Sequence, residues 1–197
     1  MLVIKIGEGG VPESYANAVE KRGGKATPFT EVNLTKSGYV TSKNINEDKS
    51  LSETKLIQLE YWNYIKDTFS EKKSFISLRK PRAQHWYSFS LGRSKFNISL
   101  TVNTIKKKLG CELYMRGDQA KKAFAELAKE KEEIESELNT QLNWQELPEG
   151  RDCRIILYRD GDILDKNSWE STSQWFLKWA ELFHKSFSER IKKINLQ

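Results

Sequence analysis

The stretch HWYSFSLGRSKFNISLTV, residues 85–102, decides the fold. On each side of its Gly92-Arg93-Ser94-Lys95 segment, large apolar residues alternate with small polar ones. A period of two is typical of a strand that buries one face, and the segment between the runs is typical of a hairpin loop. The sequence therefore predicts an antiparallel hairpin with strands over 85–91 and 96–102. The faces expected to point inward are His85, Tyr87, Phe89 and Leu91 in the first run, and Phe96, Ile98, Leu100 and Val102 in the second.

The same reasoning extends to both sides of this hairpin. Apolar residues at helical spacing predict helices over 53–71, 118–138 and 168–194. Short apolar or alternating runs predict further strands over 74–79, 109–116, 142–147 and 151–158. A block of consecutive strands indicates an α+β domain over residues 51–197, with the order α-ββββ-α-ββ-α. We expect an antiparallel sheet of four to six strands, covered by three helices on one face. Residues 1–50 are expected to form an N-terminal extension or linker with a short strand at Leu2–Ile6.

Composition excludes several classes of protein. Six Trp, seven Tyr and nine Phe among 197 residues are too many for a disordered chain. No apolar run reaches the roughly 18 residues of a membrane span, and the start MLVIKIGEGG lacks the features of a secretory signal. The two cysteines, Cys111 and Cys153, are too few for a disulfide framework or a cysteine-built zinc site, and both fall on inward strand positions. We expect a reducing compartment, the cytoplasm, and no membrane partner.

The positive charge is concentrated in one part of the chain. The net charge is only +6, yet residues 72–111 carry ten Lys and Arg and no Asp or Glu. These bases fall mostly at strand ends and turns, and a local positive field favours polyanions such as DNA or RNA. Arg79–Arg82 and Lys106–Lys108 are expected at the same end of the sheet, because turns alternate between the two ends of a meander. The alternative is that these bases protect sheet edges or pair with the acidic helix at 126–137.

The outward face of the predicted hairpin is small and polar. Ser88, Ser90, Asn97, Ser99 and Thr101 share it, and Trp86 and Tyr114 lie beside them. Such a face could stack nucleic-acid bases, although an ordinary solvent-facing sheet has a similar composition. The residues expected to contact nucleic acid are Arg79, Lys80, Arg82, Trp86, Arg93, Lys95, Lys106, Lys107, Lys108 and Tyr114.

Catalytic motifs are not readable in this sequence. His85 and His184 lack the spacing of a Ser/His/Asp or Cys/His arrangement, and Asp160-Gly161-Asp162 is more typical of a turn than of a calcium loop. A metal-dependent nuclease needs acids on adjacent strands, and the basic strands contain none before Glu112. We therefore predict no catalytic residue, no metal and no cofactor. An unseen enzyme site would need a cleft that gathers acids such as Glu112, Asp118 and Asp160.

A second hypothesis is a protein-interaction or dimerisation module. Trp169, Trp175 and Trp179 cluster in the last predicted helix, and Trp175 falls at the edge of its apolar stripe. A partly exposed tryptophan there could anchor a partner or a second copy of the chain. The alternative is that Trp175 packs on a neighbouring segment.

The stretch RKPRAQHWYSFSLGRS, residues 79–94, resembles the signature of a prokaryotic family, the domain-of-unknown-function family 4268 (DUF4268). Glu112-Leu113-Tyr114, Leu142-Asn143-Trp144 and Arg154-Ile155 agree with it, and the resemblance covers about residues 52–193. It implies a domain that often follows a PD-(D/E)XK-like nuclease domain in restriction or defence proteins. Because the family has no settled activity, no catalytic residue is carried over. With only some 50 residues before the domain, a nuclease role would need a separate subunit.

Overall fold

A computed structural model of the chain describes residues 51–77, 79–147 and 149–196, all within the unit Asn46–Gln197. The strand expected at Leu2–Ile6 lies outside the described residues. The helices are α3 (Glu53–Glu71), α4 (Ala120–Ala128), α5 (Lys131–Leu138), the short 3-10 helix η1 (Lys166–Ser168) and α6 (Trp169–Lys193). The strands are β1 (Trp86–Ser90), β2 (Phe96–Asn103), β3 (Lys108–Met115), β4 (Asn143–Glu146) and β5 (Cys153–Asp160).

The five strands form one antiparallel sheet in the order β1-β2-β3-β5-β4. The hairpin of β1 and β2 pairs Tyr87 with Leu100, and β2 pairs Ser99 with Glu112 of β3. On the other side of β3, Glu112 lies opposite Ile156 of β5. The α+β class and the antiparallel sheet predicted from the alternating runs are therefore confirmed.

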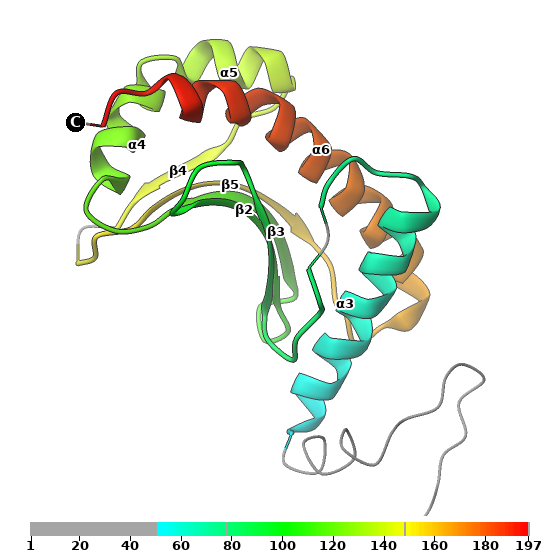
Figure 1. Cartoon of the computed structure of the whole chain (residues 1–197). Helices are drawn as coiled ribbons and strands as arrows, with labels where there is room; N and C mark the ends of the chain where they lie inside the picture. The colour runs from blue at the N-terminus through cyan, green and yellow to red at the C-terminus, as the bar shows by residue number, and fades with distance from the viewer. Residues whose placement is uncertain (1–50, 78, 148, 197) are drawn as a thin grey trace, which may run out of the picture. The chain divides into compact units, whose positions relative to one another are not determined.

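All the helices cover one face of this sheet (Figure 1). The sheet is bent, the helices lie along its outer, convex side, and the concave side carries no helix. α3 packs on the edge strand β1, where the rings of Phe69 and Phe89 stack with centroids 5.8 Å apart. α6 packs on β2 and β3, and α4 packs on β3 and β5. None of the helices in the described ranges is long and apolar enough to cross a membrane.

The apolar positions of the strands form the core beneath the helices. Ile98, Leu100, Cys111, Leu113 and Ile155 are fully buried there. Cys111 and Cys153 are both buried and unpaired, as their inward positions predicted. His85 departs from the predicted pattern, because it precedes β1 and is exposed. Buried and exposed side chains thus alternate within the strands, and the alternation stops where the hydrogen-bonded strand pairs end.

The strand predicted over 74–79 is absent from the described residues of that segment. Side chains hold the connection between α3 and β1 in place of ladder hydrogen bonds. Trp62 Nε1 donates to the carbonyl of Gln84 at 2.7 Å, and the Tyr87 hydroxyl donates to the carbonyl of Arg79. β1 is consequently the edge of the sheet.

The single helix predicted over 118–138 is two helices, α4 and α5, separated at Lys129-Glu130. Its apolar stripe is interrupted at this point: Leu127 and Ile134 are buried, but the positions between them are exposed. No apolar contact holds the middle turn on the core, so the helix breaks there. The described domain therefore has four α-helices where three were expected.

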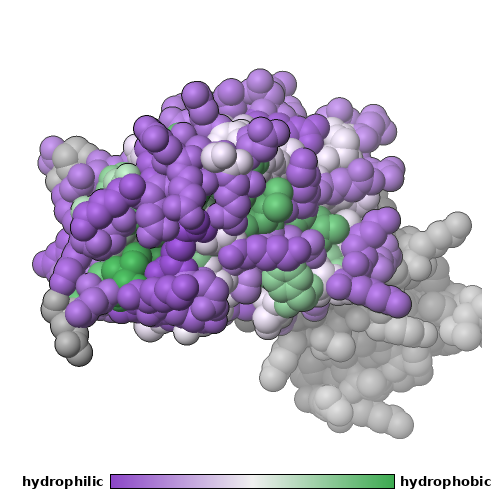
Figure 2. All heavy atoms as spheres, turned by 90° about the horizontal axis from the view of Figure 1, so that it is seen from above, coloured by the Kyte–Doolittle hydropathy of each residue, from purple (hydrophilic) through white to green (hydrophobic). Residues whose placement is uncertain are grey.

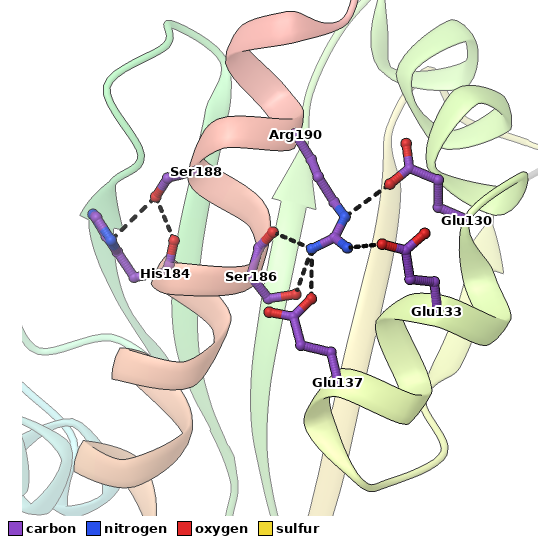
Figure 3. A network of polar contacts seen from close by, with 7 residues as sticks. All are labelled: Glu130, Glu133, Glu137, His184, Ser186, Ser188 and Arg190. Carbon is purple, nitrogen blue, oxygen red and sulfur yellow. Dashed lines mark hydrogen bonds and ion pairs between the residues drawn. The ribbon is translucent and has the colours of Figure 1, made fainter.

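Arg190 of α6 joins this broken helix pair to the rest of the domain (Figure 3). Its guanidinium contacts Glu130, Glu133 and Glu137 at 2.9, 3.3 and 2.7 Å, and also donates to the carbonyl of Ser186 at 2.7 Å. Burial disfavours the charged guanidinium, but the hydrogen bonds that it donates to Glu130 and Glu137 outweigh this effect and raise the pKa of Arg190. The acids of α5 therefore pair with α6.

We predict that Arg190→Ala lowers the free energy of unfolding by about 1–3 kcal/mol, because it leaves three carboxylates repelling one another on α5. Urea unfolding followed by tryptophan fluorescence measures this change. Lys192→Ala is the control, since it removes only an exposed ion pair with Glu189. If the two variants were equally stable, Arg190 would not hold α5 in place.

Arg93 caps the C-terminal end of α6. Its Nη1 donates to the carbonyls of Ile191 and Ile194, the latter at 2.8 Å, and its guanidinium lies 5.7 Å from the Phe96 ring centroid. The last carbonyls of a helix lack intrahelical donors, and a cation there is favoured by the helix dipole. The β1–β2 hairpin is thereby tied to the C-terminus of α6.

Arg93→Ala should lower the free energy of unfolding by about 1–2 kcal/mol, because two helix-end carbonyls lose their donor. Ser94→Ala, an exposed change in the same loop, is the control. Hydrogen exchange at the last turn of α6 should accelerate in Arg93→Ala alone. Unchanged exchange would show that the guanidinium does not cap the helix.

Candidate functional site

The uncovered face of the sheet is hollowed into a cavity of about 920 Å³. All five strands contribute residues to its floor. β4 contributes only Asn143. The volume is in the range of pockets that bind small ligands, roughly 300–1,000 Å³. The sheet is bent (Figure 1), and side chains of both β1 and β5 line its cavity. This polar concave face is called the sheet cavity below.

Aromatic side chains line one end of the sheet cavity. Trp86 at the start of β1 is 41% exposed, and the His85 ring meets it edge-on with centroids 4.6 Å apart. Tyr158 of β5 is 39% exposed. The register explains this grouping, because Trp86 pairs with Thr101, Thr101 with Gly110, and Gly110 with Tyr158. Aromatic surface is therefore available at this end of the sheet.

A third ring is held in place at the opposite end of the sheet cavity. The hydroxyl of Tyr114 donates to Asp152, whose other oxygen accepts the Gly117 amide at 2.8 Å. Burial and this nearby carboxylate raise the pKa of Tyr114 to about 12, so the hydroxyl stays protonated. Tyr114 thus presents a fixed, neutral ring to the sheet cavity.

Four bases line the sheet cavity: Lys106, Lys108, Arg116 and Arg154. Lys108 pairs with Asp160 at 2.7 Å, and Arg154 Nε donates to Gln145 Oε1 at 2.6 Å. Within the described part of the chain, Lys106 and Arg116 form no ion pair. These two cations are therefore free to bind an anion from solution.

Glu112 lies between β2 and β5 in the sheet cavity and is 95% buried, with a relative exposure of 5%. Its Oε2 has no hydrogen-bond partner, and the nearest cation, Arg154 Nη1, is 3.8 Å away. That distance permits charge attraction but exceeds hydrogen-bond range. Burial raises the pKa of Glu112 to about 7, and Arg154 offsets only part of this shift.

The backbone beneath the sheet cavity is closely packed beside Glu112. A Cβ on Gly110 would lie 2.6 Å from Thr101 Oγ1 and 2.8 Å from Ile156 Cδ1, so only glycine fits. Ser88 and Ser99 bond each other across β1 and β2 at 2.9 Å. The small residues predicted on this face thus keep the floor low and leave room above it.

Of the ten residues expected to contact nucleic acid, four line the sheet cavity and six do not. Trp86, Lys106, Lys108 and Tyr114 line the sheet cavity. Lys107 pairs with Asp162 at 3.1 Å, and Arg93 caps α6. The register places the start of β1 and the β2–β3 turn at one end of the sheet, whereas the strand that was expected to carry the Arg79–Arg82 turn is absent from the described residues. Arg79, Lys80, Arg82 and Lys95 are exposed but do not line the sheet cavity.

Four lining residues were missed by the sequence reasoning as ligand contacts: Glu112, Arg116, Arg154 and Tyr158. Glu112 occupies an outward position of β3, a strand that was predicted nearly to its ends, and Arg116 directly follows that strand. Arg154 and Tyr158 alternate with buried residues on β5. The alternation of the sequence indicates that these side chains point outward. Only the pairing of β5 with β3 shows that they lie near one another.

The described residues offer little to an enzymatic or metal site. They contain no group of three or more His, Cys, Asp or Glu placed to hold a metal ion. Ser188 lies 3.1 Å from His184 Nδ1, one turn away on α6, and this is the Ser–His contact found in the described part of the chain (Figure 3). Ser188 also donates to the His184 carbonyl, so this serine bonds back to its own helix.

The polar, basic and aromatic sheet cavity lies within a domain that matches one family model. That model is "Domain of unknown function (DUF4268)", and it covers residues 57–191. No curated protein and no solved structure matches the chain. Because the match spans most of the sequence, and the resemblance at 79–94 falls inside it, the chain belongs to the DUF4268 family.

Proposed function

We propose that this domain is a non-enzymatic nucleic-acid-binding module whose sheet cavity takes a single strand. The observation that carries the proposal is the meeting of free cations and exposed rings on one uncovered, concave sheet face. Proteins that bind single strands combine a positive groove for phosphates with aromatic side chains on which bases stack.

Trp86 and Lys106 are the two central members of this arrangement. They lie at the same end of the sheet, since Trp86 pairs with Thr101 and Lys106 lies in the following β2–β3 turn. A base stacked on Trp86 would leave its phosphate within reach of this turn. Arg116, at the other end of β3, offers a second phosphate contact one strand-length away.

A single strand suits the sheet cavity better than a duplex. Base stacking on protein rings requires bases that are already unpaired, and bases in a duplex are stacked on each other. The side chains of Ser88, Asn97, Ser99 and Thr101 offer hydrogen bonds at the floor without filling the space. Phosphate contacts alone would bind either form.

The biological setting we propose is that of an accessory module in a restriction, anti-phage defence or mobile-element system. The support is the family membership and the tendency of this domain to accompany nuclease domains. In that setting nucleic-acid cleavage belongs to a separate nuclease subunit, and this domain supplies binding in the cytoplasm. The buried, unpaired thiols of Cys111 and Cys153 fit a reducing compartment.

The alternative is a protein-interaction or dimerisation module. Its best support is the edge strand β1, which pairs with β2 alone among the described strands, and Ile105, which is 93% exposed in the β2–β3 turn. Trp175 supports it less, since its ring packs 5.2 Å from Phe176 against the core. The helical side is mainly hydrophilic with scattered apolar patches (Figure 2).

Replacing Lys106 and Arg116 together by alanine tests the nucleic-acid proposal. Loss of two phosphate contacts should reduce the slope of log Kd against log salt by about 1.4 for a single-stranded oligonucleotide. Fluorescence anisotropy over a salt series measures this slope. Lys131→Ala with Lys192→Ala removes the same charge from the helical side and should leave the slope unchanged.

Two outcomes would contradict the proposal. Failure of the unmodified protein to bind any oligonucleotide at low salt excludes nucleic acid. An equal loss of slope in both double variants would show only a nonspecific effect of net charge. Light scattering on the same samples detects the alternative, because a dimer without oligonucleotide binding favours the interaction module.

A further inference from the structure

Glu112 is a buried acid among the bases of the sheet cavity. Its relative exposure is 5%, and its Oε2 finds no hydrogen-bond donor within the described residues. Lys106, Lys108, Arg116 and Arg154 line the same cavity. A carboxylate that is removed from water without full hydrogen bonding is costly, so this position favours the neutral acid. Protonation of Glu112 therefore decides whether a negative charge lies beneath the bases.

Two strands pack against Glu112, and only β5 brings a charge close to it. On β2, Ser99 lies opposite Glu112, and the outward side chains of that strand are all uncharged. On β5, Ile156 lies opposite Glu112, between Arg154 and Tyr158 on the same face. Arg154 Nη1 is 3.8 Å from Glu112 Oε2, which is within range of charge attraction but beyond a hydrogen bond.

Other charged and titratable groups lie along β3 itself. They are Lys108, Cys111, Tyr114 and Arg116, which directly follows the strand. Burial raises the pKa of the Cys111 thiol, and burial with the Asp152 carboxylate raises the pKa of Tyr114 to about 12. Neither of these two groups therefore changes its charge at neutral pH. Beyond β2 and β5, the outward side chains of β1 are uncharged and β4 contributes Asn143 to the cavity.

We propose that the sheet cavity takes up a proton from solvent at Glu112 when it binds a single strand, so that binding weakens as pH rises through neutrality. This inference rests on the proposed function and adds the regulation of that site. The carboxylate repels phosphate and attracts Arg154, whereas the neutral acid does neither. The linkage is reciprocal, because the negative charge of a bound strand favours the protonated acid. The strand does not touch Glu112, since only a proton has to reach the buried oxygen.

The electrostatic environment of Glu112 supports this linkage. Burial raises the pKa of Glu112 to about 7, and the cation of Arg154 offsets part of this shift. The acid is therefore present in both forms at neutral pH before any ligand binds. Phosphate in the cavity would disfavour the carboxylate further and raise this pKa again.

The test measures the affinity for a thymine oligonucleotide at pH 6 and at pH 8, at one ionic strength, by fluorescence anisotropy with a pH-insensitive label. The oligonucleotide carries no terminal phosphate, because that group itself titrates at about pH 6. The unmodified protein should bind about three- to tenfold more tightly at pH 6, the effect of one charge across a solvated cavity. Glu112→Gln should lose most of this difference and bind more tightly than the unmodified protein at pH 8.

Two control variants separate Glu112 from other sources of pH dependence. Glu146→Gln makes the same change on β4 at an exposed residue that does not line the sheet cavity, and it should keep the full difference. Imidazole groups gain a proton in the same pH range, and His85 lines the sheet cavity. His85→Gln should nevertheless keep most of the difference.

Proton uptake is measured directly by isothermal titration calorimetry in two buffers that differ in ionisation heat. At about pH 7.5 the unmodified protein should take up about half a proton per bound oligonucleotide. Glu112→Gln should take up close to none.

A thermal melt separates the linkage from folding. Protonation of Glu112 stabilises the folded state below its unfolded pKa near 4.5, and this stabilisation is lost as pH rises through about 7, with Arg154 on β5 opposing the loss. Glu112→Gln should therefore melt no lower than the unmodified protein at pH 8.

The two proposals fail in different ways. Equal binding at pH 6 and pH 8, or a difference that survives in Glu112→Gln, overturns the proton linkage and leaves single-strand binding intact. Loss of the difference in His85→Gln also overturns it, because the titrating group is then the imidazole. Absence of binding at low salt at both pH values overturns both proposals.

Discussion

One-sided burial of a bent antiparallel sheet is the constraint on which the other features depend. Apolar residues at every second strand position draw α3, α4 and α6 onto the convex face, and none of the helices of residues 51–196 that the structure describes covers the concave one. Polar residues must then occupy the second face, since apolar ones there would be exposed to water. The sheet cavity is the consequence: its floor is built by the same alternation that builds the core.

The distribution of charge follows from the same arrangement. Acids collect on α5 and are tied to α6 by Arg190, on the helical side of the sheet. The bases of residues 72–111 collect at strand ends and turns, where they remain exposed. Part of this charge is neutralised locally, since Lys107 and Lys108 pair with Asp162 and Asp160. Intramolecular pairing therefore accounts for part of the charge of this segment, whereas the neighbouring Lys106 forms no ion pair within the described residues.

Sequence alone predicts the hairpin over 85–102, the extent of α3 and the α+β class, because these depend on local periodicity. It wrongly predicts a strand at 74–79. Ile76 is buried in the core there, but the segment does not pair with another strand among the described residues. It misses the break in 118–138 because α5 is held by Arg190, which is distant in sequence. From the sequence, Glu112 was an outward strand residue and one of three acids, with Asp118 and Asp160, that a cleft would need to gather. Its burial and its place beside Arg154 depend on the pairing of β3 with β5.

A folded chain gains no stability from an unpartnered acid beneath a cavity. Glutamine at position 112 would have nearly the same shape without a charge, and an apolar residue would pack against Ile156 on the neighbouring strand. A carboxylate is the costlier choice in this place, as the raised pKa of Glu112 indicates. The helical side contains no comparable exception, since Oε2 of Glu112 is the one unsatisfied buried side-chain atom among the described residues. The imbalance lies on the face of the sheet that no helix among the described residues covers, and four Lys and Arg side chains line the cavity on that face.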